Sequence, residues 1–267
     1  MNRLRETAAD WIAIGEPTVL VEVLHTQGSV PRDVGARMLV STTAAAGTVG
    51  GGHLELKAIE QARQLLNDAS APLQVRYPLG PALGQCCGGV VTLGFSVLTP
   101  ATLAAWPIEP ARFHLQLYGA GHVGRAVARL LADLPVAVDW IDEREYEFPD
   151  ALGTACWPAH IRKRSVDVAE GEVDSAAPGD SYLVLTHRHD LDLRITEAIL
   201  KRGDFGFLGL IGSHTKKQRF LHHFESRGIP PEVLARLTCP IGLPGISGKE
   251  PELVALAVVA QLMTDRP

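Results

Sequence analysis

The chain has 267 residues, 46% of them hydrophobic and 21% charged, which is enough for one large or two ordinary globular domains. Its 25 basic and 30 acidic residues give a net charge of −5 and form no long block of one sign, so a general nucleic-acid-binding surface is not expected. No apolar run approaches the roughly 18 residues of a membrane helix, and charged residues interrupt any secretory signal. We therefore expect a cytoplasmic protein whose four cysteines stay reduced.

The first part of the chain, residues 1–98, is predicted to be a small α+β domain. Apolar residues at helical spacing indicate an amphipathic helix at the start, and β-branched runs indicate strands after it. In chain order we expect a helix within 1–15, strands at 18–26 and 36–41, a helix near 53–67, and strands at 73–79 and 89–98.

Residues 99–112, "TPATLAAWPIEPAR", contain three prolines and no sustained pattern, so we interpret them as a linker. Strand and helix patterns alternate beyond it, over 113–267, with short connections. This alternation predicts a Rossmann-like domain with a doubly wound parallel sheet. The expected strands are 113–121, 136–142, 181–187 and 206–213, and the expected helices are 122–133, about 190–202, 214–226 and about 249–263.

The stretch "LQLYGAGHVGRAVARLL" places Gly119, Gly121 and Gly124 in G-x-G-x-x-G spacing between a strand and a helix. The first glycine permits a tight turn, the second lets a pyrophosphate approach the backbone, and the third lets helix and strand pack closely. Asp142 ends the next expected strand, where a carboxylate binds ribose hydroxyls in dinucleotide sites. The alternative is that these glycines serve only the turn, because one fold hosts many functions.

A second anion-binding candidate is "GLIGSHTKKQRF", in which a strand ends at Gly212 and a helix opens with hydroxyl and basic side chains. Ser213 and Lys216 would suit a phosphate at this helix start. The alternative is a helix capped by Ser213 with a solvated basic face.

In "THRHDLDL", His187 and His189 project the same way if the segment is extended, which permits a metal site. The alternative is that Asp190 or Asp192 caps the next helix while the histidines line the ligand-binding edge of the sheet. His222 and His223 are expected at the surface.

Cys86 and Cys87 are adjacent within "GPALGQCCGGVVTLGF". A disulfide between neighbouring residues is strained, and zinc would need two more ligands that Cys156 and Cys239 do not offer at a paired spacing. Two interpretations remain. The pair is either one or two exposed thiols stabilised by glycine N–H groups, or two small buried hydrophobes beside a hairpin.

Taken together, these stretches resemble the XdhC family of xanthine dehydrogenase accessory proteins. The resemblance covers nearly the whole chain. Its motifs are "GSVPRDVGARMLV", "GTVGGGHLE", "LGPALGQCCGG", "LYGAGHVGRAV", "WIDEREYEFP", "THRHDLDL", "GLIGSHTKKQRF" and "TCPIGLPGISGKEP".

The resemblance implies a chaperone without turnover of its own. Such proteins bind molybdenum cofactor (molybdopterin) as cargo, hold it while a cysteine desulfurase replaces an oxo ligand with sulfur, and help to insert it into xanthine dehydrogenase. They commonly form homodimers.

The resemblance points to Cys86 and Cys87 for contact with the molybdenum or the transferred sulfur, since a soft thiolate suits both. Residue chemistry then suggests further contacts to the pterin and its phosphate, namely Arg32, Arg37, Gly51, Gly52, Gly88 and Gly89. The contribution of the Rossmann-like half is open between the cofactor's phosphate, an added nucleotide and a separate dinucleotide.

Two other functions compete with this interpretation. An NAD(P)-dependent oxidoreductase would rest on Gly119, Gly121, Gly124 and Asp142, but the sequence shows no convincing proton donor beside a substrate pocket. A non-catalytic scaffold would join desulfurase and dehydrogenase without retaining cofactor.

Overall fold

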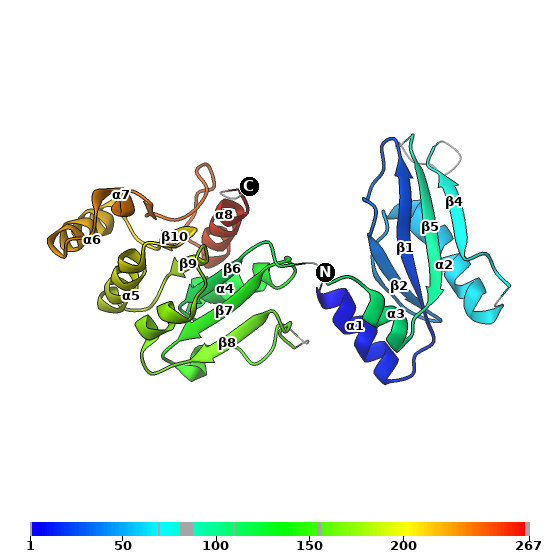
Figure 1. Ribbon diagram of the computed structural model, residues 1–267, viewed down its shortest axis with the longest axis horizontal. Coiled ribbons are helices and arrows are strands. Elements are labelled where there is room, and N and C mark those ends of the chain that lie inside the picture. The colour runs from blue at the N-terminus through cyan, green and yellow to red at the C-terminus, as the bar shows by residue number, and fades with distance from the viewer. Residues whose placement is uncertain (1, 69, 81–87, 109, 154–155, 265–267) are drawn as a thin grey trace. The chain divides into compact units, whose positions relative to one another are not determined.

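The computed structural model describes the chain except residues 1, 69, 81–87, 109, 154–155 and 265–267. It divides into two compact units, Met1–Ile108 and Glu109–Pro267 (Figure 1). Among the described residues, no helix has the length and apolar character needed to cross a bilayer.

The first unit is built on an antiparallel five-stranded sheet with the order β3-β2-β1-β5-β4. Alternate residues of β1 face opposite sides, as a strand requires. Val19 and Val21 pack in the core that α2 covers, whereas Leu20 packs with α1. The elements are α1 (Asn2–Ala13), β1 (Thr18–Gln27), β2 (Arg37–Ser41), β3 (Ala45–Gly47), α2 (Gly52–Asn67), β4 (Gln74–Pro78), β5 (Val90–Val97) and α3 (Pro100–Ala105).

The linker expected over 99–112 is largely part of the first unit. Thr99 caps α3 through a reciprocal pair of hydrogen bonds with Thr102. Trp106, only 4% exposed, packs in the core beside α1, and Arg5 donates to its carbonyl at 2.8 Å. Burial of a large indole ties this proline-rich stretch to the sheet, so the division between units falls after Ile108.

The second unit is a parallel six-stranded sheet with the order β11-β10-β9-β6-β7-β8. The helices α4 and α8 pack in the core on one face, and α5 and α6 in the core on the other. This confirms the predicted α/β architecture with a doubly wound parallel sheet. The elements are β6 (His114–Tyr118), α4 (His122–Leu131), β7 (Ala137–Asp142), η2 (Glu145–Glu147), β8 (Ile161–Ser165), η3 (Ala169–Ser175), β9 (Ser181–Val184), α5 (His189–Arg202), β10 (Phe207–Leu210), α6 (His214–Ser226), α7 (Pro231–Leu234), β11 (Leu237–Thr238) and α8 (Pro251–Thr264).

Three of the four edge strands, β3, β8 and β11, are absent from the sequence-based prediction, whereas the fourth, β4, was expected at 73–79. β8, "IRKRS", is mostly charged, while β3 and β11 have three and two residues. An edge strand has one paired neighbour and little burial, so its sequence lacks the apolar run that marks a central strand.

Strand order reverses between β6 and β9, the first and fourth strands of the second sheet. In such sheets ligands bind beyond the carboxyl ends of the strands near this reversal. The loops after β6, β9 and β10 meet at that edge and supply the candidate site.

Candidate functional site

The glycine-rich turn after β6 has the close packing that its spacing predicts. Gly119 has φ of 120°, and a Cβ there would lie 2.4 Å from the Leu185 carbonyl oxygen. A Cβ on Gly124 would lie 2.0 Å from the Gly119 carbonyl oxygen. Gly121 precedes α4 and faces open space. Two of the three glycines therefore serve the turn itself, and only Gly121 leaves room for a ligand.

Asp142 ends β7 beside this turn, and its carboxylate binds the chain's own donors. Oδ2 accepts from the Ala120 N–H at 2.7 Å and from Arg144 Nη2 at 3.0 Å. Oδ1 accepts from the Arg144 N–H and Nε, both at 2.9 Å. The side chain is 3% exposed. These bonds use the roughly four acceptor positions of a carboxylate, so a ribose hydroxyl would have to displace one of them.

The electrostatics of Asp142 follow from these contacts. Burial favours the neutral acid, but hydrogen bonds from Arg144 and from the Ala120 N–H outweigh it, and the pKa of Asp142 is lowered. Arg144 in turn reaches Glu147 at 3.1 Å, and Arg125 of α4 donates to the Glu147 carbonyl at 2.7 Å and to its carboxylate. The η2 segment is thereby fastened to α4 next to the glycine-rich turn.

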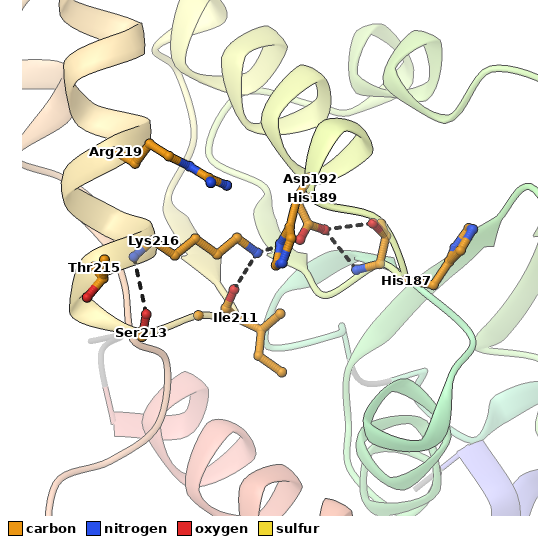
Figure 2. Close-up of a pocket in the computed structure, with 10 residues that line it drawn as sticks. His187, His189, Asp192, Ile211, Ser213, Thr215, Lys216 and Arg219 are labelled. Carbon is orange, nitrogen blue, oxygen red and sulfur yellow. Dashed lines mark hydrogen bonds and ion pairs between the residues drawn. The ribbon is translucent and has the colours of Figure 1, made fainter.

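A cleft of about 450 Å³ opens between the loops after β9 and β10 (Figure 2). One wall comes from the β9 loop and the start of α5, and the other from the β10 loop and the start of α6. Polar or charged side chains stand on both walls among apolar surface. The lining residues are Thr186, His187, His189, Asp192, Ile211, Gly212, Ser213, Thr215, Lys216 and Arg219.

An ion pair between Lys216 and Asp192 crosses the inner end of this cleft. Lys216 Nζ lies 2.5 Å from Asp192 Oδ2 and donates to the Ile211 carbonyl at 2.8 Å. The two side chains are 8% and 2% exposed. Asp192 Oδ1 accepts from the Thr186 N–H and hydroxyl at 2.9 and 2.7 Å. The pair is therefore anchored to β9 and β10 at once.

Gly212 provides the space that Lys216 needs. A Cβ at position 212 would lie 2.6 Å from Lys216 Cδ. A larger residue would push the lysine away from Asp192, so this glycine positions a side chain and is not itself a ligand contact.

Ser213 caps α6, one of the two interpretations that the sequence left open, by accepting from the Lys216 N–H at 3.2 Å. Arg219, one and a half turns further on, is exposed, and its guanidinium carbon lies 5.9 Å from the centroid of the Phe220 ring. In Figure 2 the side chains of Lys216 and Arg219 both extend from α6 toward α5. The cleft thus carries two cations against one carboxylate.

Neither acidic residue of "THRHDLDL" caps α5, which the alternative interpretation of the sequence had expected. The N-cap of α5 is Arg188, with no side-chain cap, while exposed Asp190 pairs with Arg188 and Arg194. His187 and His189 do line the carboxyl edge, on the cleft. Among the residues that the structure describes, no three metal-binding side chains of the His, Cys, Asp and Glu type gather.

Of the two histidines expected at the surface, His222 is exposed but His223 is half-buried and lies 3.2 Å from Glu197. Burial raises the pKa of Glu197, but hydrogen bonds from Lys201 and His223 reverse this, so its pKa is lowered. Glu197 therefore holds α6 against α5 and takes no part in the cleft.

In the first unit, three glycine-bearing motifs meet at the loop after β1. A Cβ on Gly89 would lie 2.3 Å from the Ser29 carbonyl oxygen, and one on Gly50 would lie 2.5 Å from Pro31 Cγ. Gly88 is exposed and faces open space. A polar hollow of about 300 Å³, bordered by Gln27 and Val90, lies beside this junction. Cys86 and Cys87 immediately precede it but lie outside the described residues.

The other predicted contacts of the first unit divide into two kinds. Arg37 is committed to packing, since it pairs with Glu22 across the sheet and lies 5.1 Å from the centroid of the Trp106 ring. Arg32 is exposed. Gly51 and Gly52 have φ of 76° and 60°, a backbone shape that glycine adopts readily at the start of α2.

Sequence reasoning placed Ser213, Lys216 and Arg219 together at one helix start but missed the partnership of Lys216 with Asp192. The charge pattern "THRHDLDL" gave a signal for Asp192, because an acid after a buried strand is costly to bury unless a cation neutralises it.

Comparison with known proteins finds matches in both units. A model of the XdhC Rossmann domain matches residues 115–262, and a model of the XdhC and CoxI family matches residues 11–78. The uncharacterized protein YqeB of Escherichia coli K12 is 28% identical over 254 residues, which are 92% of this chain and 43% of YqeB. The chain thus spans less than half of that curated relative.

A solved structure has the same fold. A crystal structure described as a xanthine dehydrogenase from Bacillus halodurans matches with a TM-score of 0.75 at 19% identity, covering 99% of this chain and 95% of that one. At this level of identity the likeness establishes the arrangement of elements and nothing of the chemistry.

Proposed function

This chain belongs to the XdhC family, and on that premise we propose that it takes part in the maturation of xanthine dehydrogenase. In this proposal it is a chaperone that holds molybdenum cofactor as cargo while a cysteine desulfurase sulfurates it, and it performs no turnover itself. The observation that carries the proposal is the match of family models in both units, in order along the chain. The structure from Bacillus halodurans described as a xanthine dehydrogenase shares the fold of both units.

The glycine-rich backbone beside the loop after β1 supports the proposal for the first unit. Its three glycine-bearing motifs converge where Gly88 is exposed and Gly89 touches the loop after β1. Glycine lets a bulky, planar pterin approach main-chain N–H and carbonyl groups closely. Cys86 and Cys87 adjoin this junction in the sequence, and we propose that at least one of them contacts the molybdenum or the incoming sulfur.

Cofactor retention is the first test. We expect protein purified from cells that make molybdopterin to carry it, as detected by mass spectrometry of the released small molecule. We also expect the loaded protein to raise the activity of sulfur-free xanthine dehydrogenase when a cysteine desulfurase is present. Protein that neither retains molybdopterin nor raises this activity contradicts the proposal.

The thiols have a matched control within the chain. Cys86→Ala and Cys87→Ala, singly and together, should reduce cofactor retention and sulfuration, whereas Cys156→Ala should change neither, because Cys156 is an exposed thiol of the second unit. Equal retention by all these variants removes the cysteines from the cargo site.

The partners follow from the proposed role. We propose xanthine dehydrogenase and a cysteine desulfurase as binding partners, a homodimer as the assembly and the cytoplasm as the location. Size-exclusion chromatography with light scattering tests the dimer, and pull-down with each purified enzyme tests the partners. Partner binding without retained cofactor would instead favour a scaffold.

An oxidoreductase remains the competing function. The glycine-rich turn favours it, but the carboxylate that would bind ribose is engaged by Ala120 and Arg144. Titration with NAD⁺ and NADP⁺, followed by protein fluorescence, separates the two functions. Tight binding of either dinucleotide, with no retained pterin, would favour the oxidoreductase.

A further inference from the structure

We propose that the cleft between the β9 and β10 loops is the anion site of the Rossmann unit and takes a phosphate monoester. The glycine-rich turn is then a packing element, although its sequence is the usual mark of a phosphate loop. The site is tested with inorganic phosphate, so the result does not depend on whether the proposed function is correct. That function enters only in the suggestion that the phosphate of the pterin cargo is the natural occupant.

Lys216 has a donor left for such a ligand. An ammonium group has three N–H donors, and the hydrogen bonds seen among the described residues, to Asp192 and Ile211, use two. Its side chain is 8% exposed and lines the cleft. Nζ also lies 5.2 Å from the centroid of the Phe220 ring, a weaker contact than a hydrogen bond, so an anion in the cleft would supply the acceptor for the third donor.

Arg219 adds a second cation on the same wall. No carboxylate contact of Arg219 is found in the part of the chain that the structure describes, so its charge remains available beside that of Lys216. Asp192 offsets one positive charge, and the site keeps a net charge of about +1 from these three groups. A negative ligand is therefore favoured over a neutral or cationic one.

Several potential donors line the space, as a tetrahedral anion requires. Lys216 lies at the inner end, Arg219 extends from α6 toward α5, and Ser213 and Thr215 are also among the lining residues (Figure 2). A planar carboxylate meets such donors in one plane, whereas the three terminal oxygens of a phosphate monoester accept from several directions. His189 borders the same space, where a ring N–H can donate to an anion.

The cleft also has room for the rest of the molecule. It holds about 450 Å³, within the range of small-molecule sites. A second hollow of about 340 Å³ lies between α5 and α6, and His189 and Arg219 border both spaces. A phosphate seated at Lys216 therefore leaves an exit toward α5 for the organic part.

The test is a titration with sodium phosphate at constant ionic strength, balanced with sodium chloride. Backbone amide chemical shifts locate the anion, and the thermal unfolding midpoint reports binding independently. We expect the largest shifts at Gly212–Lys216 and a midpoint that rises with phosphate.

Matched variants connect the response to the cleft. Arg219→Gln should weaken phosphate binding about tenfold, the effect of losing one charged hydrogen bond. Lys217→Gln removes the same charge from the same helix outside the cleft lining and should weaken binding less than about twofold. The double variant Asp192→Asn/Lys216→Met removes both buried charges together and should lose phosphate binding while remaining folded.

Three results would overturn the proposal. The first is a wild-type protein whose amide shifts do not respond to phosphate. The second is a response centred on Gly119–Gly121, which would return the anion to the glycine-rich turn. The third is equal weakening by Arg219→Gln and Lys217→Gln, which would reduce the effect to overall charge. If phosphate binds as expected but molybdopterin is not retained, the anion site is supported and molybdopterin is rejected as the cargo.

Discussion

Two loops of the Rossmann unit lie at the carboxyl edge of one sheet, and they differ in what they offer a ligand. In the glycine-rich turn, the Ala120 N–H is bound to Asp142, and Gly119 and Gly124 are pressed against neighbouring backbone. In the cleft after β10, Lys216 is paired but keeps a donor, and Arg219 remains available. Glycines in G-x-G-x-x-G spacing indicate that backbone segments pack closely. A ligand site also needs hydrogen-bond donors that are not already bound to other groups of the chain.

The sharpest test of this contrast is Lys216→Met. It leaves Asp192 buried without its cation, and we expect a loss of about 3–5 kcal/mol of unfolding free energy. Asp192→Asn/Lys216→Met removes both charges, and Asn keeps an acceptor for Thr186, so this variant should recover most of the loss. Urea unfolding measures both. A single variant as stable as the wild type would show that the pair is not desolvated as described.

Substitutions in the glycine-rich turn should lower the unfolding free energy by overcrowding the packed backbone. Gly124→Ala brings a Cβ against the Gly119 carbonyl oxygen, and we expect it to cost about 2–3 kcal/mol. Gly121→Ala is the matched control, because its Cβ meets open space and its φ of −70° suits alanine, so its cost should stay within about 1 kcal/mol. The same urea experiment applies. Equal costs would mean that the turn is looser than its contacts indicate.

Asp142 should behave as a structural carboxylate. Asp142→Asn breaks its pairing with Arg144 and should cost about 1–3 kcal/mol at neutral pH. Because the pKa of Asp142 is lowered by folding, its contribution is fully present above the unfolded carboxyl pKa of about 3.9 and is lost as pH falls through the folded value. The stability gap between wild type and variant should therefore narrow below about pH 4. A gap that widens with acid would refute this role.

The smallest effect expected is at Thr186. Thr186→Val removes a 2.7 Å hydroxyl contact to Asp192 but keeps the N–H contact, so we expect a cost of about 1 kcal/mol. Thr215→Val changes an exposed hydroxyl at the same cleft and should stay within about 0.5 kcal/mol. Thermal unfolding of the two variants side by side measures the difference. Equal midpoints would show that the Thr186 hydroxyl does not hold the ion pair.

Much of the fold was predictable because its signals are local. The central strands are apolar runs, and the helices carry one apolar face or follow a glycine turn, so periodicity located both. The edge strands β8 and β11 and the helix α3 were not found, since a charged or two-residue strand and a proline-rich helix have no such pattern. Trp106 illustrates the limit. Its packing against α1 joins segments nearly a hundred residues apart, and no local window contains both.

By itself, the sequence determined the class of fold, the order of the two units and the sharp glycine turn, and it offered the cap at Ser213 as one of two interpretations. Each of these depends on neighbours within one or two turns of the chain. Only the tertiary structure decided that Asp142 pairs with Arg144, that Lys216 pairs with Asp192, and that Arg37 packs on Trp106. The reason is physical: which donors a side chain has left for a ligand depends on all the groups packed around it, and packing brings those groups from distant parts of the chain.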